Sequence, residues 1–130
     1  MTASSEFSLR LLHLLQILPP GRVISYGRLA AAAGSPRGAR QVVRFLHSSA
    51  ERLNLPWHRV VDRHGTIRLP HNGGWELQKA LLEAEGVEVD GSGVIDLGRY
   101  LWIPSGLQRF TDLAEEGLGG PKSHFTDPMP

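Results

Sequence analysis

Apolar residues recur at helical spacing in the first part of the chain. Positions 7, 11, 14, 15 and 18 are phenylalanine or leucine, with polar residues between them. This spacing predicts an amphipathic helix over residues 5–18. The helix is expected to end at Pro19, Pro20 and Gly21, since proline and glycine are poor continuations of a helix.

Two shorter helices are expected next. Ser25 is a suitable N-cap for a helix that runs through Ala33, and Gly34 is the residue type that commonly follows a helix end. Ser35 is then expected to cap a second helix, with Pro36 at its first position. This pattern predicts two consecutive helices joined by a Gly-Ser-Pro turn.

The second of these helices is predicted over residues 36–47 or 36–48. It carries Arg40 and Arg44 one turn apart, on one face of the helix. Two helices joined by a tight turn, the second bearing such arginines, are typical of a helix-turn-helix.

Beyond residue 55 the pattern changes. Residues 57–61 and 66–69 flank an Asp-Arg-His-Gly sequence, which predicts a short hairpin or a pair of extended segments. Two glycines then precede a helical run with Leu77, Leu81, Leu82 and Glu85 along it, ended by Gly86. Residues 87–104 are predicted to be irregular or extended, with a turn at Asp90-Gly91-Ser92-Gly93.

The fold class that follows is mainly α, a winged-helix-like helix-turn-helix domain with a short extended or hairpin segment. We expect this domain to occupy residues 1–104. Residues 105–130 are dominated by glycine, proline and charge, and are predicted to be a peripheral or partly disordered C-terminal extension. At 130 residues the chain is long enough for one compact core and too short for two.

Composition narrows the classes of function. The chain has no cysteine, which excludes disulfides, thiolate metal sites and thiol catalysis. No apolar run approaches the roughly 18 residues of a membrane span, and the leucine-rich start lacks the features of a signal peptide, so no membrane association is expected. His64 and His71 are seven residues apart on a polar loop, which is a weak basis for a metal site. We predict no metal and no cofactor, and a cytoplasmic location.

The charge is unevenly distributed. The whole chain carries +1, yet residues 22–68 hold nine arginines against Glu51 and Asp62, a net charge of +7. Arginine binds phosphate through two parallel hydrogen bonds and stacks on bases. This asymmetry is compatible with a polyanionic partner such as a nucleic acid, and equally with an arginine-rich surface that serves solubility.

One motif carries a more specific signal. Residues 55–61 read Leu-Pro-Trp-His-Arg-Val-Val, which resembles the active-site motif Pro-Cys-His-Arg-Val of the O6-alkylguanine-DNA alkyltransferases, with Trp57 in place of the reactive cysteine. Residues 23–30 and 34–42 resemble the family's helix-turn-helix. The similarity continues through residues 73–86, and residues 100–104 look like the ending common in alkyltransferase-like proteins.

The resemblance implies a protein that binds and flips O6-alkylguanine without transferring the alkyl group. Dealkylation needs a soft anionic nucleophile, and the nitrogen lone pair of the Trp57 indole is delocalised into its ring. We therefore expect no enzymatic activity. The resemblance further implies double-stranded DNA containing the lesion as partner, marking of the lesion for nucleotide excision repair proteins, association with the nucleoid when bound, and a monomer.

The resemblance also assigns roles to individual residues. Tyr26 is expected to crowd the 3′ phosphate and Arg40 to be the finger that fills the vacated stack. His58 and Glu85 are expected to form a structural hydrogen-bond network, since the thiol they would serve is absent. Apart from the resemblance, Arg28, Arg37 and Arg44 are expected to contact phosphates or to lie in solvent. The predicted lesion pocket comprises Trp57, Tyr26, His58, Arg59 and Arg68.

Two other functions compete with this interpretation. A helix-turn-helix transcription regulator would need base-reading side chains on the second helix and dimer symmetry, and it leaves the Pro-Trp-His-Arg motif unexplained. A glycosylase or lyase using His58 and Glu85 would release an abasic product from an alkylguanine oligonucleotide.

Overall fold

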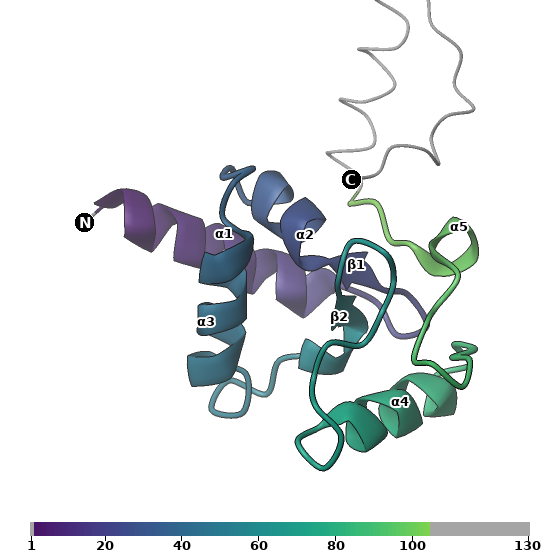
Figure 1. The fold of residues 1–130 in the computed structure, drawn as a ribbon. Coiled ribbons are helices and arrows are strands. Elements are labelled where there is room, and N and C mark those ends of the chain that lie inside the picture. Colours follow the sequence, from purple (N-terminus) through teal and green to yellow (C-terminus); the bar gives the residue numbers. More distant parts are fainter. Residues whose placement is uncertain (1, 105–130) are drawn as a thin grey trace, which may run out of the picture.

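The structure, a computed structural model, describes residues 2–104 of the chain and the side chains of residues 6–104. The predicted C-terminal extension lies outside this range. The described elements are mainly helical, as predicted, and are shown in Figure 1: α1 (Thr2–Ile17), β1 (Ile24–Ser25), α2 (Tyr26–Ala32), α3 (Ala39–Ser49), η1 (Trp57–Arg59), β2 (Val60–Val61), α4 (Trp75–Ala84) and α5 (Leu97–Tyr100). None of these helices is both long and apolar enough to cross a membrane.

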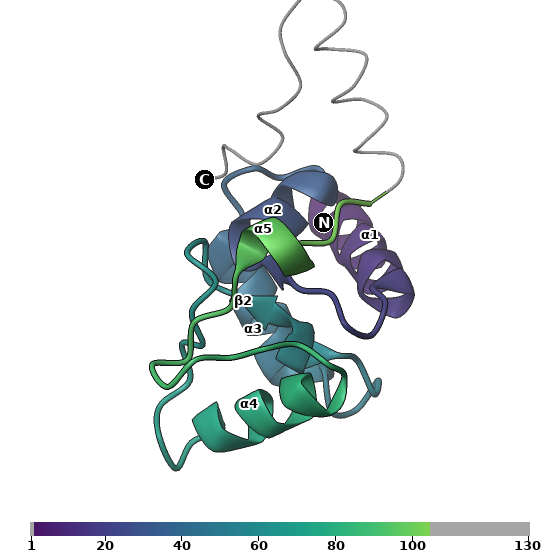
Figure 2. The ribbon, with the colours of Figure 1, turned by 90° about the vertical axis from the view of Figure 1, so that its right-hand side faces the viewer.

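Helix α1 begins three residues earlier than predicted and ends one residue earlier. Its apolar stripe is buried as the spacing requires: Leu11, Leu14 and Leu15 lie in the same core as Leu18 just beyond the helix. Helices α2 and α3 pack over this core, so the helix-turn-helix rests on the amino-terminal helix (Figures 1 and 2).

Helix α2 begins where the sequence predicts. The Ser25 hydroxyl accepts a hydrogen bond from the backbone N–H of Arg28 at 3.1 Å, which is the expected N-cap. After Ala33, Gly34 adopts φ +100°, a left-handed conformation that side chains rarely adopt, and this lets the chain leave the helix. The predicted end of α2 is thus confirmed.

Helix α3 begins at Ala39, so the predicted cap at Ser35 and start at Pro36 are wrong. The backbone N–H of Gly38 donates to the carbonyl of Ser35 at 2.9 Å and closes a separate turn before the helix. The fixed φ of proline suits the second position of such a turn as well as the first turn of a helix, so Pro36 could not distinguish the two. Arg37 consequently lies in the turn, whereas Arg40 lies in the first turn of α3.

The two strands form a short parallel pair, with Ile24 opposite Val60 and Ser25 opposite Val61. The hairpin alternative is wrong, because β2 pairs with β1 and Thr66 bridges to Val94. All four strand residues are buried, and pairing with β1 satisfies backbone groups that an isolated hairpin at this position would leave inside the core.

A second core lies on the other side of the strand pair. It joins Val23, Val61 and Leu82 to buried residues from the carboxy-terminal part of the described chain, Val87, Val89, Ile95 and Tyr100. The prediction of irregular chain over residues 87–104 misses the single turn of α5, which Asp96 caps by accepting from the Gly98 N–H. Figure 2 shows α4 at the bottom of the view, apart from α1 at the upper right.

Candidate nucleic-acid interface

The Pro-Trp-His-Arg motif forms one turn of 3₁₀ helix, η1, immediately before β2. The turn is closed by backbone bonds from the Arg59 N–H to the Pro56 carbonyl at 3.1 Å and from the Val60 N–H to the Trp57 carbonyl. Trp57 is half-buried and meets the His58 ring edge-on, with 6.0 Å between ring centroids. The turn therefore presents a partly exposed indole.

Glu85, at the end of α4, holds the side chains of this turn. It accepts three hydrogen bonds from the Arg59 guanidinium, the shortest 2.7 Å from Nη2 to Oε2, and its Oε2 lies 2.8 Å from His58 Nε2. The backbone N–H of Gly21 donates to Oε1 at 3.0 Å, and Arg59 Nη1 donates to the Leu18 carbonyl. This network ties the turn to α4 and to the end of α1.

The network also sets the ionisation of Glu85. Burial on its own raises the pKa of a carboxyl, but the hydrogen bonds from Arg59, His58 and Gly21 outweigh it and lower the pKa of Glu85 to about 2. The carboxylate is therefore ionised at neutral pH. A group with so low a pKa is a weak general base near neutrality.

Gln78 is a residue of the site that the sequence interpretation missed. Its side chain is 1% exposed, and its Nε2 donates to the carbonyls of His58 and Val60, each at 3.0 Å. A signal was present, because Gln78 precedes Leu82 by four residues and so shares its buried face. Leu77, which the same pattern suggested for packing, is 55% exposed.

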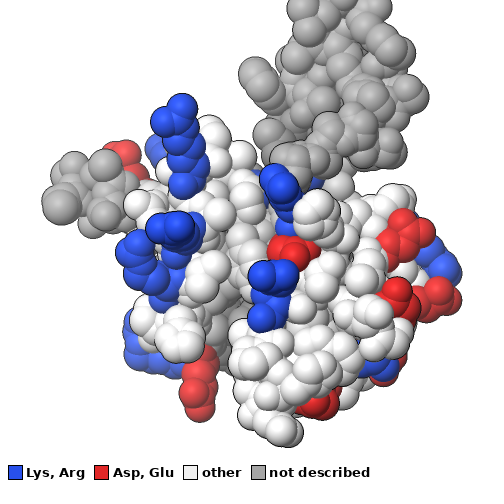
Figure 3. Space-filling view, viewed as in Figure 1, with Lys and Arg blue, Asp and Glu red and all other residues white. Residues whose placement is uncertain are grey.

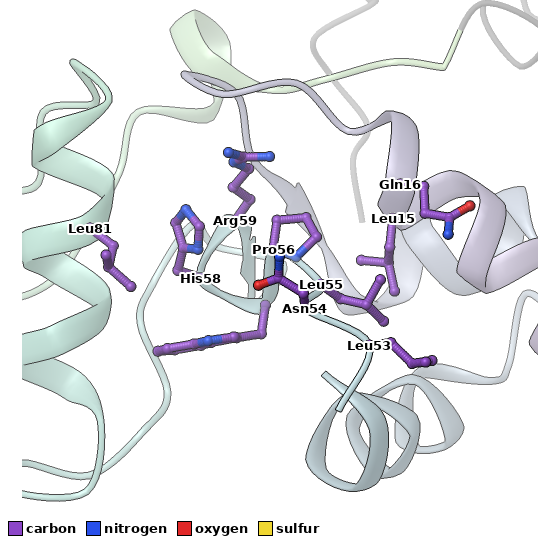
Figure 4. A pocket seen from close by; sticks show the side chains of 10 residues that line it. Leu15, Gln16, Leu53, Asn54, Leu55, Pro56, His58, Arg59 and Leu81 are labelled. Carbon is purple, nitrogen blue, oxygen red and sulfur yellow. The ribbon is translucent and has the colours of Figure 1, made fainter. Parts of the chain in front are cut away.

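A cavity of about 610 Å³ opens beside the turn. Figure 4 shows Leu81 reaching it from α4 on one side and Leu15 and Gln16 from α1 on the other, with His58 and Arg59 between them. Trp57 completes this part of the lining. Three of the five residues predicted for the lesion pocket, namely Trp57, His58 and Arg59, therefore line one cavity.

The other two predicted pocket residues meet at a separate cluster. The register of the strand pair places Tyr26 directly after β1 and Asp62 directly after β2. Asp62 accepts from the backbone N–H groups of His64 and Thr66, each at 2.8 Å, and its other oxygen lies 3.8 Å from Arg68 Nη1. Burial and the Asp62 charge raise the pKa of Tyr26, with Arg68 opposing them. Tyr26 and Arg68 thus both lie near Asp62, and neither of them lines the cavity.

Three of the predicted DNA-contacting arginines have no partner within the described part of the chain. Arg37, Arg40 and Arg44 are exposed, and none of them makes a hydrogen bond or ion pair with residues 6–104. Arg28 is half-buried and engaged in an interaction of its own. Figure 3 shows basic side chains gathered over the α2–α3 side and over the loop after β2, whereas acidic side chains lie mainly toward α4. The charge asymmetry of the sequence is thus an asymmetry of the surface.

Comparisons with known proteins agree with this arrangement. The profile of the 6-O-methylguanine DNA methyltransferase DNA-binding domain matches residues 6–87. The DNA base-flipping protein of Escherichia coli K12 is 49% identical over 102 residues, covering 78% of each chain. Alkyltransferase-like protein 1 of Schizosaccharomyces pombe is 35% identical over 104 residues, which are 76% of this chain and 96% of that protein.

A solved structure shares the fold. It is S. pombe Atl1 in complex with damaged DNA containing O6-carboxymethylguanine, and it matches with a TM-score of 0.69 and 33% sequence identity, over 77% of this chain and 97% of that one. Profile, relatives and fold together show that the chain belongs to the 6-O-methylguanine DNA methyltransferase DNA-binding family, among its alkyltransferase-like, base-flipping members.

Proposed function

We propose that this protein recognises O6-alkylguanine in double-stranded DNA by flipping the base and holding it, without removing the alkyl group. The observation that carries the proposal is the η1 turn: Trp57 occupies the cysteine position of the alkyltransferase motif, and Glu85 holds the neighbouring side chains in place. In this proposal residues 1–104 are the DNA-binding unit, which acts as a monomer on nucleoid DNA.

The absence of cysteine supports the non-enzymatic part of the proposal. Removal of the alkyl group requires a soft, anionic nucleophile, and a thiolate is the side chain that meets this requirement. The chain has no cysteine at any position, so no neighbouring thiol replaces the missing one. Bound DNA should therefore be released with its alkyl group intact.

The roles of the DNA-contacting residues remain part of the proposal. The lesion pocket spans both clusters, with Trp57 from one and Tyr26 and Arg68 from the other. Arg40 enters the duplex as the intercalating finger, and Arg28, Arg37 and Arg44 contact phosphates. This division fits the side chains of Arg37, Arg40 and Arg44, which are exposed and have no partner among residues 6–104. His58 and Arg59 act through the Glu85 network, since His58 Nε2 and the Nε and Nη2 atoms of Arg59 are bound to Glu85.

The glycosylase alternative loses support from the same network. His58 and Glu85 are bound to each other and Glu85 also binds Arg59, which leaves neither group uncommitted. The low pKa of Glu85 further disfavours it as a proton acceptor at neutral pH. We further infer that the bound complex marks the lesion for nucleotide excision repair. A protein without a nucleophile to remove the alkyl group leaves the lesion in place, so other proteins must complete the repair.

The decisive experiment is a titration of matched duplexes with and without one O6-methylguanine, followed by mass analysis of the recovered DNA. Modified DNA should bind at least about ten-fold more tightly, a difference of about 1.4 kcal/mol. The recovered oligonucleotide should keep its mass. Equal affinities would contradict lesion recognition, whereas loss of the alkyl group would contradict the non-enzymatic role.

A further inference from the structure

Gln78 occupies a position where packing alone would favour an apolar side chain. It is 1% exposed, lies one helical turn before the fully buried Leu82, and its Oε1 has no hydrogen-bond partner among the described residues. An unpaired buried acceptor destabilises a folded protein. A methionine or leucine would fill the same space without that cost, so the amide contributes something other than packing.

Its contribution is made through Nε2. The two carbonyls that accept from it belong to His58, in η1, and Val60, the first residue of β2. These residues flank Arg59, so one amide fixes the backbone at the junction between the turn and the strand. The assignment of the amide is not ambiguous, because both partners are acceptors and only the nitrogen can donate to them.

Gln78 and Glu85 hold the same turn in different ways. They are seven residues apart, about two turns of helix, and therefore face the same side of α4. Glu85 binds the side chains of His58 and Arg59, whereas Gln78 binds the backbone of His58 and Val60. Trp57 itself makes no side-chain hydrogen bond within the described chain, so its position depends on the backbone to which it is attached.

We propose that Gln78 is a positioning residue for lesion recognition, whose paired hydrogen bonds to the His58 and Val60 carbonyls hold the Trp57 ring at the place where it meets the flipped base. The inference rests on the proposed function. It assigns lesion discrimination partly to a buried residue of α4, an element outside the helix-turn-helix.

The first test uses Gln78→Met, which keeps the length of the side chain and removes both donors. The ratio of affinities for O6-methylguanine duplex and plain duplex should fall at least about three-fold, and affinity for plain duplex should stay within about two-fold of the wild type. Val87→Ala is the matched control. Val87 is equally buried, at 1% exposed in the second core, and its apolar side chain forms no hydrogen bond. Both variants are measured at temperatures that give the same folded fraction.

A double variant separates positioning from a general loss of stability. With Trp57→Ala in place, Gln78→Met should leave the affinity ratio unchanged, because the ring that it positions is gone. An unchanged ratio in Gln78→Met alone would overturn the proposal. An equal fall in Val87→Ala, or a further fall in the double variant, would overturn it too.

A second measurement needs no DNA, so it distinguishes failure of this inference from failure of the proposed function. The chain has three tryptophans, and Trp75→Phe with Trp102→Phe leaves Trp57 as the remaining one. In that background Gln78→Met should increase acrylamide quenching of Trp57 fluorescence, whereas Val87→Ala should not. Unchanged quenching overturns the positioning role, while a wild type without lesion preference overturns the proposed function alone.

Discussion

Trp57 exposes part of an aromatic ring beside side chains that are bound to Glu85. A ring of this size can stack on, or meet the edge of, an extruded base, and this contact is available only when a base has left the duplex. Trp57→Ala should therefore narrow the affinity gap between lesion-containing and plain duplex, by about 1 kcal/mol or more. Anisotropy titrations of both duplexes measure it. If both affinities fall in parallel, or if circular dichroism shows that the variant is unfolded, Trp57 is a structural residue and its assignment to the lesion pocket is wrong.

The proposed role of Arg40, unlike that of the other exposed arginines, can be tested by comparing duplex with single-stranded DNA. Extruding a base from a duplex costs a few kcal/mol of stacking and pairing, and most of this cost is absent in a single strand. A side chain that fills the vacated stack therefore matters mainly in duplex DNA. Arg40→Ala should weaken binding of duplex O6-methylguanine at least about five-fold more than binding of the same lesion in a single strand.

Arg44→Ala is the natural control for Arg40→Ala, because Arg44 lies one turn further along α3 and its substitution removes the same charge. A phosphate contact exists in both substrates, so Arg44→Ala should show no such difference between duplex and single strand. Tyr26→Ala should resemble Arg40→Ala if Tyr26 drives the rotation. Equal losses for Arg40→Ala on the two substrates would make Arg40 one more phosphate contact.

At the scale of elements, α3 and the turn before it present a row of cations. Arg37, Arg40 and Arg44 have no ion-pair partner within residues 6–104, so they are available to displace counterions from DNA. The log–log slope of affinity against salt should be steeper than about −2, and Arg37→Ala or Arg44→Ala should each make it shallower by up to about 1. Both variants should lower the affinity for damaged DNA and for plain DNA to the same extent. A slope near zero would restrict the role of the arginines to solubility.

The sequence interpretation succeeded where an element is determined by its own residues. The leucines of α1 and the Ser25 cap of α2 act over one or two turns, and both were predictable. It failed where the deciding partner is distant in the chain. The pairing of β2 with β1 is such a case, because its partners are 36 residues apart. The turn before α3 is local, and there Pro36 suited a turn and a helix start equally well.

The same distinction between local and distant partners separates the site residues that the sequence predicted from those that it did not. Trp57, His58, Arg59 and Glu85 were recognisable because they stand in a contiguous motif and at a helix end. The helical spacing places Gln78 on the buried face of α4, but its two partners, carbonyls about twenty residues away, could not be predicted from the sequence. The grouping of Tyr26 and Arg68 near Asp62 was likewise not predictable, because it depends on the register of the two strands.

At the scale of the whole molecule, Glu85 joins α4, η1 and the end of α1 through a carboxylate that is only 16% exposed. Because its pKa is lowered from 4.5 to about 2 in the folded protein, the stabilisation is fully present above the unfolded value and is lost as the pH falls toward 2. This difference corresponds to at most about 3 kcal/mol in the free energy of unfolding.

Urea unfolding at a series of pH values tests this linkage. The wild type should lose stability steeply between about pH 4.5 and 2, and Glu85→Gln should flatten that part of the profile. Glu83→Gln is the control, since Glu83 is a more exposed carboxyl paired with Lys79 on the same helix. Identical acid profiles for the wild type and Glu85→Gln would show that the network does not contribute to stability.

The two-residue strand pair also determines where the chain tolerates changes in length. Between β1 and β2 lie the helix-turn-helix and the loop at residues 50–56, yet the pair fixes both ends of this segment relative to each other. Extra residues among the exposed positions 51–54 lengthen a surface connection, and loop-closure entropy rises only slowly with length. An insertion between Val61 and Asp62 would instead move Asp62 away from its place opposite Tyr26. Insertions into the loop after α3 should therefore be tolerated better than insertions at the carboxyl ends of the two strands.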